Sequence, residues 1–128
     1  MKTQYTVALA IIAGFGLGAA AIESLHAQAK PPVFVITEID VTTQEAYMKE
    51  YAPKAQAAIK KSGGRLLAAG GKLTVIEGAP PKSRVAVTVW DSMEKIQAWR
   101  NSKEFNEARK VGAKYATFRT YAVEGVSR

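Results

Sequence analysis

Residues 62–78 of the sequence, SGGRLLAAGGKLTVIEG, place two glycine pairs around a short apolar run. A phosphate-binding loop puts its glycines after a strand and at the start of a helix. Here the order is reversed, because a helical pattern ends at Gly63 and strand-like residues begin at Arg65. The first pair therefore fits the left-handed turn after a helix, and the second fits a bulge, a tight turn or a sharp bend in a strand over 66–77. The glycines are predicted to shape the backbone.

The helix before this stretch is predicted over 42–62. Thr42 and Glu45 have the spacing of a capping box, which marks the start of a helix. Pro53 lies inside the helix and should kink or divide it after its second turn. The buried side of the helix is expected to carry apolar and aromatic residues at helical spacing. These are Tyr47, Tyr51, Ala55, Ala58 and Ile59.

Three further stretches are rich in β-branched and aromatic residues and predict strands. Residues 33–41, VFVITEIDV, and 84–90, RVAVTVW, contain few charges and should be largely buried. Residues 116–126, ATFRTYAVEGV, form the last predicted strand. The stretch GAPPKS at 78–83 is a loop, because its prolines cannot enter a central ladder.

Two shorter helical segments lie between the last two predicted strands. Asp91 and Glu94 repeat the capping-box spacing at the start of the first segment. Asn101-Ser102 should end it, and the second segment follows over 103–111. The predicted element order is therefore β-α-β-β-α-α-β.

The two halves of the chain resemble each other at their ends. The strand after the first helix ends in VIEG at 75–78, and the last strand ends in AVEG at 122–125. Two matched βαβ halves are typical of the split βαβ, ferredoxin-like arrangement. We therefore predict an α+β fold in which a four-stranded antiparallel sheet carries the helices on one face.

The predicted strands are apolar on both faces. The run over 85–89 is Val-Ala-Val-Thr-Val, and the strand over 33–41 has apolar residues on either side. A sheet that is covered on one face only should instead alternate apolar with polar residues. A monomer would expose a large apolar patch, and such patches normally mark interfaces. We therefore expect a two-fold homodimer with the sheets packed face to face.

Residues 1–29 have the pattern of a secretory signal peptide. A positively charged residue precedes an apolar run over 7–22, and Ala27-Gln28-Ala29 gives a small-x-small cleavage site before Lys30. An uncleaved membrane anchor is the alternative, because the run approaches the roughly 17–25 residues that span a bilayer. We expect cleavage between Ala29 and Lys30, a mature domain over 30–128, and a periplasmic or secreted bacterial protein. Membrane contact is expected only if this segment is not cleaved.

The sequence contains no cysteine, and its only histidine, His26, lies in the predicted signal peptide. The mature domain therefore has no residues for Ser-His-Asp or Cys-His catalysis, for tetrahedral zinc sites or for histidine-ligated haem. No motif has metal-ligand spacing, so we expect no metal and no cofactor. The net charge of +7 suits an anionic ligand or surface, and the expected export argues against nucleic acid as a partner.

Several stretches together resemble the domain-of-unknown-function 1330 family, in its exported branch. They are EIDV (38–41), GGR (63–65), VIEG (75–78), AW-x-x-S-x-E-F (98–105) and VEG (123–125). The resemblance covers nearly all of the mature domain and implies a dimeric α+β barrel with no established activity. Two departures concern polar groups of many members: Ala69 stands where they have an arginine, and Val89-Trp90 stands where they have Glu-Phe or Gln-Phe.

Relatives with a dimeric α+β barrel include cofactor-free monooxygenases and isomerase-like proteins, and their usual pocket lies between the sheet and the helices of one subunit. Glu38, in the middle of the first strand, is the candidate carboxylate for such a pocket. Burial would raise its pKa and could make it a general base. The alternative is that Glu38 forms an ion pair with a nearby arginine or lysine.

Other residues are candidates for binding an anionic or aromatic ligand. Arg84, Lys114 and Arg119 could bind an anion, or they could be solvated or paired with Glu77 and Glu124. Aromatic side chains could line a pocket, although at this spacing they are also typical of an ordinary core. The aromatic candidates are Tyr47, Tyr51, Trp90, Trp99, Phe105 and Tyr121.

The sequence leaves more than one function open. The first is a homodimer that binds a small anionic or aromatic molecule without turnover, which the basic charge favours. The second is a cofactor-independent monooxygenase- or isomerase-like enzyme, with Glu38 as base and an arginine or lysine as anion stabiliser. The third is a purely structural dimer. A closed pocket that holds Glu38 would favour the enzyme.

Overall fold

A four-stranded antiparallel sheet is the frame of the domain in the computed structural model, which describes residues 30–127. Its strand order is β2-β3-β1-β4, so the predicted α+β, ferredoxin-like fold is confirmed. The predicted signal segment 1–29 lies outside the described residues. The strands are β1 (Val33–Val41), β2 (Arg65–Ala69), β3 (Arg84–Trp90) and β4 (Ala116–Glu124).

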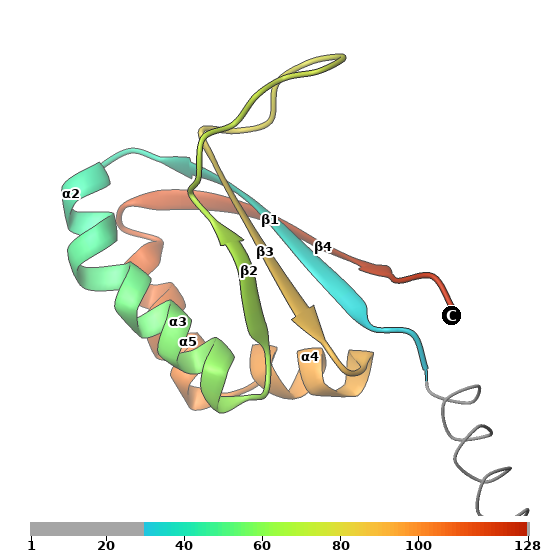
Figure 1. The fold of residues 1–128 in the computed structure, drawn as a ribbon. Coiled ribbons are helices and arrows are strands. Elements are labelled where there is room, and N and C mark those ends of the chain that lie inside the picture. Colours follow the sequence, from blue (N-terminus) through green and yellow to red (C-terminus); the bar gives the residue numbers. More distant parts are fainter. Residues whose placement is uncertain (1–29, 128) are drawn as a thin grey trace, which may run out of the picture. The chain divides into compact units, whose positions relative to one another are not determined.

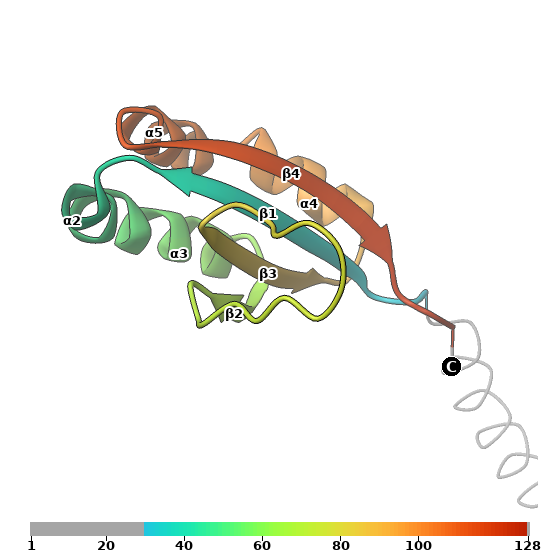
Figure 2. The same ribbon diagram turned by 90° about the horizontal axis from the view of Figure 1, so that it is seen from above.

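The helices all lie on one face of this sheet (Figure 1). Viewed from above, the other face of the sheet carries none of the helices of residues 30–127 (Figure 2). Within residues 30–127, no helix is both long and apolar enough to cross a membrane. The helical segments are α2 (Gln44–Ala46), the π-helical turn η1 (Tyr47–Tyr51), α3 (Ala52–Lys61), α4 (Met93–Arg100) and α5 (Lys103–Gly112).

The central strand β1 contributes apolar residues to both faces of the sheet. Val33, Val35 and Ile39 are buried under the helices. Phe34 and Ile36 alternate with them and point to the opposite side, which we call the open face. The open face is formed by Phe34, Ile36 and Glu38 of β1, Val85, Val87 and Val89 of β3, Arg119, Tyr121 and Val123 of β4, and Arg65 and Ala68 of β2.

Aromatic packing holds the helices onto the sheet. Trp90, at the end of β3, is 1% exposed, and its ring centroid lies 4.8 Å from that of Trp99 on α4. The indole Nε1 of Trp90 donates a hydrogen bond of 2.8 Å to the Thr88 hydroxyl, so this buried polar group is satisfied. Phe105 on α5 packs edge-on against Trp99 at 5.0 Å. Together these rings form the core between β3 and helices α4 and α5.

The predicted interruption of the first helix at Pro53 is confirmed. The α-helical pattern gives way to η1, and the backbone N–H of Ala52 bonds to the carbonyl of Tyr47, five residues earlier. Helix α3 then begins with Pro53 in its first turn, where a missing N–H costs little. Both Tyr47 and Tyr51 are buried, as the helical spacing predicts.

Neither predicted capping box is formed. The Thr42 hydroxyl donates to the carbonyl of Tyr115 at 2.9 Å, so it ties the loop before β4 to the end of β1. Thr43 precedes α2 without a side-chain cap. Serines cap the other two helices: the Oγ of Ser92 accepts from the N–H of Lys95 at 3.2 Å, and the Oγ of Ser102 accepts from the N–H of Phe105 at 3.1 Å.

The predicted strand over 66–77 is wrong beyond Ala69. The register with β3 shifts between Leu66 and Ala68, so the bulge lies before the second glycine pair. Gly70 has φ +73° and donates its N–H to the carbonyl of Val85 at 3.0 Å, which ends the ladder and turns the chain outward. Residues 71–82 then form a fully exposed connection that projects from the sheet, and we call it the arm (Figure 1).

The first glycine pair has a structural role, as predicted. Gly63 follows the end of α3 with φ +95°, the left-handed conformation typical of the position after a helix. Gly64 lies against Trp90, and a Cβ atom built on it would come within 2.5 Å of the indole ring. The tight approach of β2 to the tryptophan core therefore requires glycine at position 64.

We predict that Gly64→Ala destabilises the domain, because the new methyl group must displace Trp90 from a closely packed core. The free energy of unfolding should fall by about 1–3 kcal/mol, which is the usual loss when a substitution overpacks a core. Gly71→Ala is the matched control, since a Cβ at Gly71 meets no atom within 4 Å. Urea unfolding followed by circular dichroism measures both. Equal stabilities of the two variants would contradict this account of the core.

Candidate functional site

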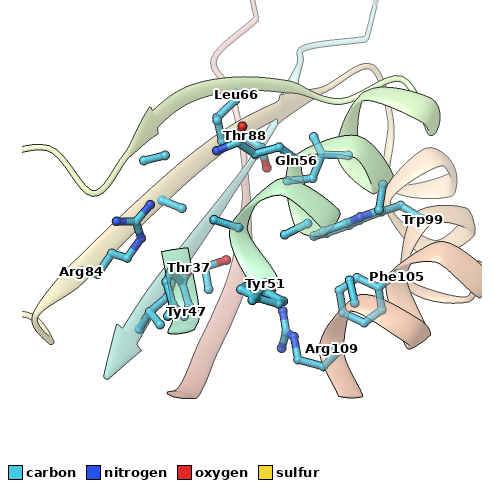
Figure 3. Close-up of a pocket in the computed structure, with 18 residues that line it drawn as sticks. Thr37, Tyr47, Tyr51, Gln56, Leu66, Arg84, Thr88, Trp99, Phe105 and Arg109 are labelled. Atoms are coloured by element: carbon cyan, nitrogen blue, oxygen red, sulfur yellow. The ribbon is translucent and has the colours of Figure 1, made fainter. Parts of the chain in front are cut away.

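A cavity of about 60 Å³ lies between the helix-covered face of the sheet and the helices (Figure 3). Strands β1 and β3 form its floor, and η1, α3 and α5 form its walls. Figure 3 shows Arg84 and Tyr47 at one end and Trp99 with Phe105 at the other. Gln56 on α3 lines the cavity and is also exposed, so the cavity reaches the surface beside α3.

The walls of the cavity are mainly apolar and aromatic. The rings of Tyr47 and Tyr51 lie 5.1 Å apart, and Tyr51 lies 5.4 Å from Phe118 behind it. The π-helical turn places both tyrosines against the sheet before α3 begins. π-helical turns of this kind occur often at functional sites. An aromatic ligand would find ring faces and edges here to pack against.

The charge in the cavity is positive and uncompensated. Arg84 and Arg109 line it, and no aspartate, glutamate or histidine of the described residues does. Neither arginine forms an ion pair with any residue of the described part of the chain. Arg109 instead lies over the Phe118 and Phe105 rings, with its Cζ 3.8 and 4.8 Å from their centroids. Cation–π contacts thus hold this guanidinium in place and leave its charge free for an anion.

Three buried hydrogen-bond donors around the cavity have no acceptor. They are the Nε of Arg84, the Nε of Arg109 and the Nε1 of Trp99. Buried N–H groups are nearly always paired, and leaving one unpaired costs about 1–3 kcal/mol. The cavity therefore offers donors, and its chemistry suits a ligand that brings acceptor oxygens.

Tyr47 is held in its neutral form. Burial raises the pKa of its phenol, and the positive charge of Arg84 acts in the opposite direction without cancelling the effect. The Cζ of Arg84 lies 5.2 Å from the centroid of the Tyr47 ring. A phenol with a raised pKa donates a hydrogen bond at neutral pH and does not serve as a base.

The structure brings together only some of the residues that the sequence singled out. Tyr47, Tyr51, Arg84 and Trp99 all line the cavity, and so does Phe105. The remaining candidates lie elsewhere.

Trp90 is buried behind Trp99 and does not line the cavity. Lys114 lies in a separate surface groove with Lys49, Lys54 and Tyr115. Surface lysines that remain hydrated form no defined site for an anion.

The predicted placement of Glu38 in a pocket is wrong. β1 turns Glu38 to the open face, away from the helices and the cavity. Its Oε2 accepts a hydrogen bond of 2.9 Å from the Nη1 of Arg119, and the Tyr121 hydroxyl lies 3.5 Å from the same oxygen. The ion-pair alternative for Glu38 is therefore confirmed, and it also accounts for Arg119.

Sequence reasoning missed Arg109, which contributes one of the two charges in the cavity. The signal was available, because Arg109 follows Phe105 by four residues and Ala108 by one on the same helix. Residues three and four apart share a helix face, so Arg109 lies at the border of the buried stripe. Among residues 30–127, no three His, Cys, Asp or Glu side chains are grouped to hold a metal ion.

Comparison with known proteins identifies a family and a fold. The family model "Domain of unknown function (DUF1330)" matches residues 32–126. No curated protein matches the sequence significantly. Solved structures similar to the domain include ones of 12–16% sequence identity, and at this level the likeness shows the fold alone.

Three of these structures illustrate the range of relatives. A protein of unknown function from Rhodopseudomonas palustris has a TM-score of 0.62 and 14% identity, with 85% of this chain and 94% of that chain covered. SnoaB, a cofactor-independent oxygenase from Streptomyces nogalater, has a TM-score of 0.57, 12% identity, and coverage of 77% and 96%. A dimeric protein of unknown function with a ferredoxin-like fold from Bacteroides fragilis has a TM-score of 0.53, 14% identity, and coverage of 73% and 96%.

We predict that Tyr47 makes the stability of the domain sensitive to alkaline pH. Its folded-state pKa is raised, so the folded protein holds the phenol proton more tightly than the unfolded chain. This contribution should be complete below about pH 10 and should be lost as the pH rises further. Unfolding free energies of the wild type and Tyr47→Phe between pH 8 and 11 measure it. The wild type should lose more stability; parallel curves would contradict the burial of this phenol.

Proposed function

This chain belongs to the DUF1330 family, whose function is unknown, and we propose that it is an exported homodimer whose cavity binds a small aromatic anion. The observation that carries the proposal is the set of three buried, unpaired N–H donors around an aromatic cavity without any carboxylate. A carboxylate or phenolate oxygen would satisfy these donors. An aromatic ring attached to it would pack against Tyr51 and Phe105.

The electrostatics of the cavity support an anion as the ligand. Two guanidinium groups that have no acidic partner among residues 30–127 create a positive potential in the cavity, which attracts a negatively charged ligand. Arginine also presents several N–H donors in a fixed plane, which matches the geometry of a carboxylate. At about 60 Å³ the cavity is smaller than the roughly 150 Å³ that holds a benzene ring, so a one-ring ligand enters only if side chains at the cavity mouth move outward.

An enzyme remains the second candidate function. The structural likeness to a cofactor-independent oxygenase concerns the fold, and a fold hosts many functions. In this chain the cavity has no carboxylate or imidazole to remove a proton, and Glu38 lies on the other face of the sheet. A reaction here would have to rely on the phenols of Tyr47 and Tyr51 as proton donors. Binding without turnover therefore ranks first.

The open face supports the homodimer. Phe34, Ile36 and Val87 lie side by side across the central strands with no helix over them. An apolar face in this position normally packs against another surface. The dimeric, ferredoxin-like protein from Bacteroides fragilis provides an example of this fold in a dimer. Two open faces packed on each other would remove both apolar surfaces from water.

Our prediction for the cavity uses benzoate as the probe and benzyl alcohol as its neutral counterpart. Benzoate should raise the melting temperature and quench tryptophan fluorescence, and benzyl alcohol should do so much less. Arg109→Gln should weaken benzoate binding about tenfold or more, because hydrogen bonds to charged groups contribute about 1.5–3 kcal/mol.

Lys110→Gln removes the same charge from the neighbouring, exposed position of α5 and should bind benzoate normally. If neither benzoate nor larger aromatic carboxylates bind, the proposed ligand class is wrong. Consumption of the bound molecule under air, followed by NMR, would favour the enzyme instead.

The homodimer is tested by native mass spectrometry of the mature domain, which should show twice the chain mass. Ile36→Lys places a charge in the centre of the open face and should give a folded monomer, since an unpaired charge cannot be buried there. Gln97→Lys, on the exposed side of α4, is the control and should remain dimeric. A monomeric wild type would refute the proposed interface.

A further inference from the structure

The arm, residues 71–82, carries three large apolar side chains that are exposed to solvent. Every residue of the arm is exposed, and Ile76 is 96% exposed, with Val75 and Leu73 also open to solvent. Connections of this length without secondary structure are uncommon in compact domains and are often functional. Three large apolar side chains in water on one such connection indicate a binding surface.

Both ends of the arm are fixed to the sheet. At its start, the N–H of Gly70 bonds to the carbonyl of Val85 at 3.0 Å. At its end, the Ser83 hydroxyl donates to the carbonyl of Ile39 at 3.2 Å and accepts from the N–H of Val41 at 3.4 Å. The two views agree that the arm projects on the side away from the helices (Figures 1 and 2). The arm and the open face therefore lie on the same side of the sheet, opposite the helices.

A second exposed apolar patch lies at the opposite corner of the sheet. Tyr121 and Val123 on β4 are 45% and 52% exposed. β4 and β2 are the two edges of the sheet, and Val123 pairs with Phe34, at the end of β1 where Trp90 lies. The arm leaves the sheet at the other end, where Arg84 pairs with Ile39. The two patches thus lie diagonally across the open face.

A two-fold axis brings such diagonal patches together. The axis would lie in the plane between two facing sheets and would cross, at its midpoint, the line that joins the arm to the patch of Tyr121 and Val123. The rotation then places the arm of each subunit against β4 of the other. An isologous dimer makes each such contact twice, so one chain supplies both halves of the surface. The face-to-face dimer proposed above permits this axis.

The polar groups of the two patches are also complementary. Lys72 precedes the apolar residues of the arm, and Glu124 follows Val123 on β4. Neither forms an ion pair with another residue of the range 30–127. As an edge strand, β4 also has backbone N–H and C=O groups on its outer side that pair with no other strand of the described range. An extended segment of the arm could pair with that edge, as peptides add strands to other sheets.

We propose that the arm of each subunit clasps the partner subunit by packing Leu73, Val75 and Ile76 against Tyr121 and Val123 of β4. The contact rests on the proposed homodimer and specifies its axis. It extends the interface beyond the open face, and it gives the exposed arm and the exposed edge strand a common role.

Cysteine cross-linking tests the contact directly, because the chain contains no cysteine of its own. Protein with Ile76→Cys, mixed and exchanged with protein carrying Val123→Cys, should form an interchain disulfide under mild oxidation. The matched control combines Ile76→Cys with Met93→Cys, which lies on α4 in the helix layer and should not cross-link. A dimeric protein that instead links two Ile76→Cys arms, or links none, overturns the proposal.

The dissociation constant of the dimer provides the second measurement. Ile76→Ser removes two apolar side chains from the interface and should raise the constant on the order of 10–100-fold in analytical ultracentrifugation. Met48→Ser, which truncates an exposed side chain in the helix layer, should leave it unchanged.

The outcomes separate the two proposals. A monomeric wild type refutes the homodimer and the clasp together, whereas a wild-type dimer that Ile76→Ser does not weaken refutes the clasp alone. Vesicles of anionic phospholipid test the alternative that the arm binds a membrane surface and not the partner subunit. Sedimentation with vesicles that requires Ile76, together with no cross-linking to Val123→Cys, would assign the arm to a membrane surface and overturn the clasp.

Discussion

The architecture of the domain depends on β1, because this strand has apolar side chains on both of its faces. This strand lies between β3 and β4, and it carries Val33, Val35 and Ile39 on one face and Phe34 and Ile36 on the other. The helices cover only the first face. Both surfaces discussed above follow from this arrangement, because the covered face lines the cavity and the open face leaves apolar side chains without a helix over them.

The cavity is unusual in the way its charges are held. Most buried arginines are paired with carboxylates, whereas Arg109 is held by aromatic rings and Arg84 lies beside the Tyr47 ring. Their Nε groups and the Trp99 indole have no acceptors, which lowers the stability of the fold. The surrounding aromatic packing offsets this loss. Such a cost is expected at a binding site, since a ligand with acceptor oxygens removes it. In a purely structural core, apolar side chains would have filled the same space without the cost.

The fold was predictable because periodicity and the order of elements suffice to specify it. The strands at 33–41 and 84–90 and the interruption at Pro53 followed from local pattern alone. The site was only partly predictable, because alternation assigns Glu38 to a face of β1 but does not say which face the helices cover. The pairing of β1 with β4, which places Arg119 beside Glu38, is a long-range contact that the sequence does not reveal. Arg109 was missed for the opposite reason: its helical spacing was visible, but spacing alone does not show that a charge at the border of a buried stripe lies over an aromatic ring.

The prediction of a strand over 66–77 is wrong beyond Ala69, and the residues where it is wrong are informative. KLTVIE, residues 72–77, has the composition of a strand, yet no strand within residues 30–127 pairs with it. β-propensity describes how well a residue fits a half-buried, paired surface, and it has no effect where that surface is absent. A strand-like segment held away from its own sheet is therefore suited to a surface on another molecule. The unpaired outer edge of β4 is such a surface, so a second copy of the chain would give this sequence the partner that its composition calls for.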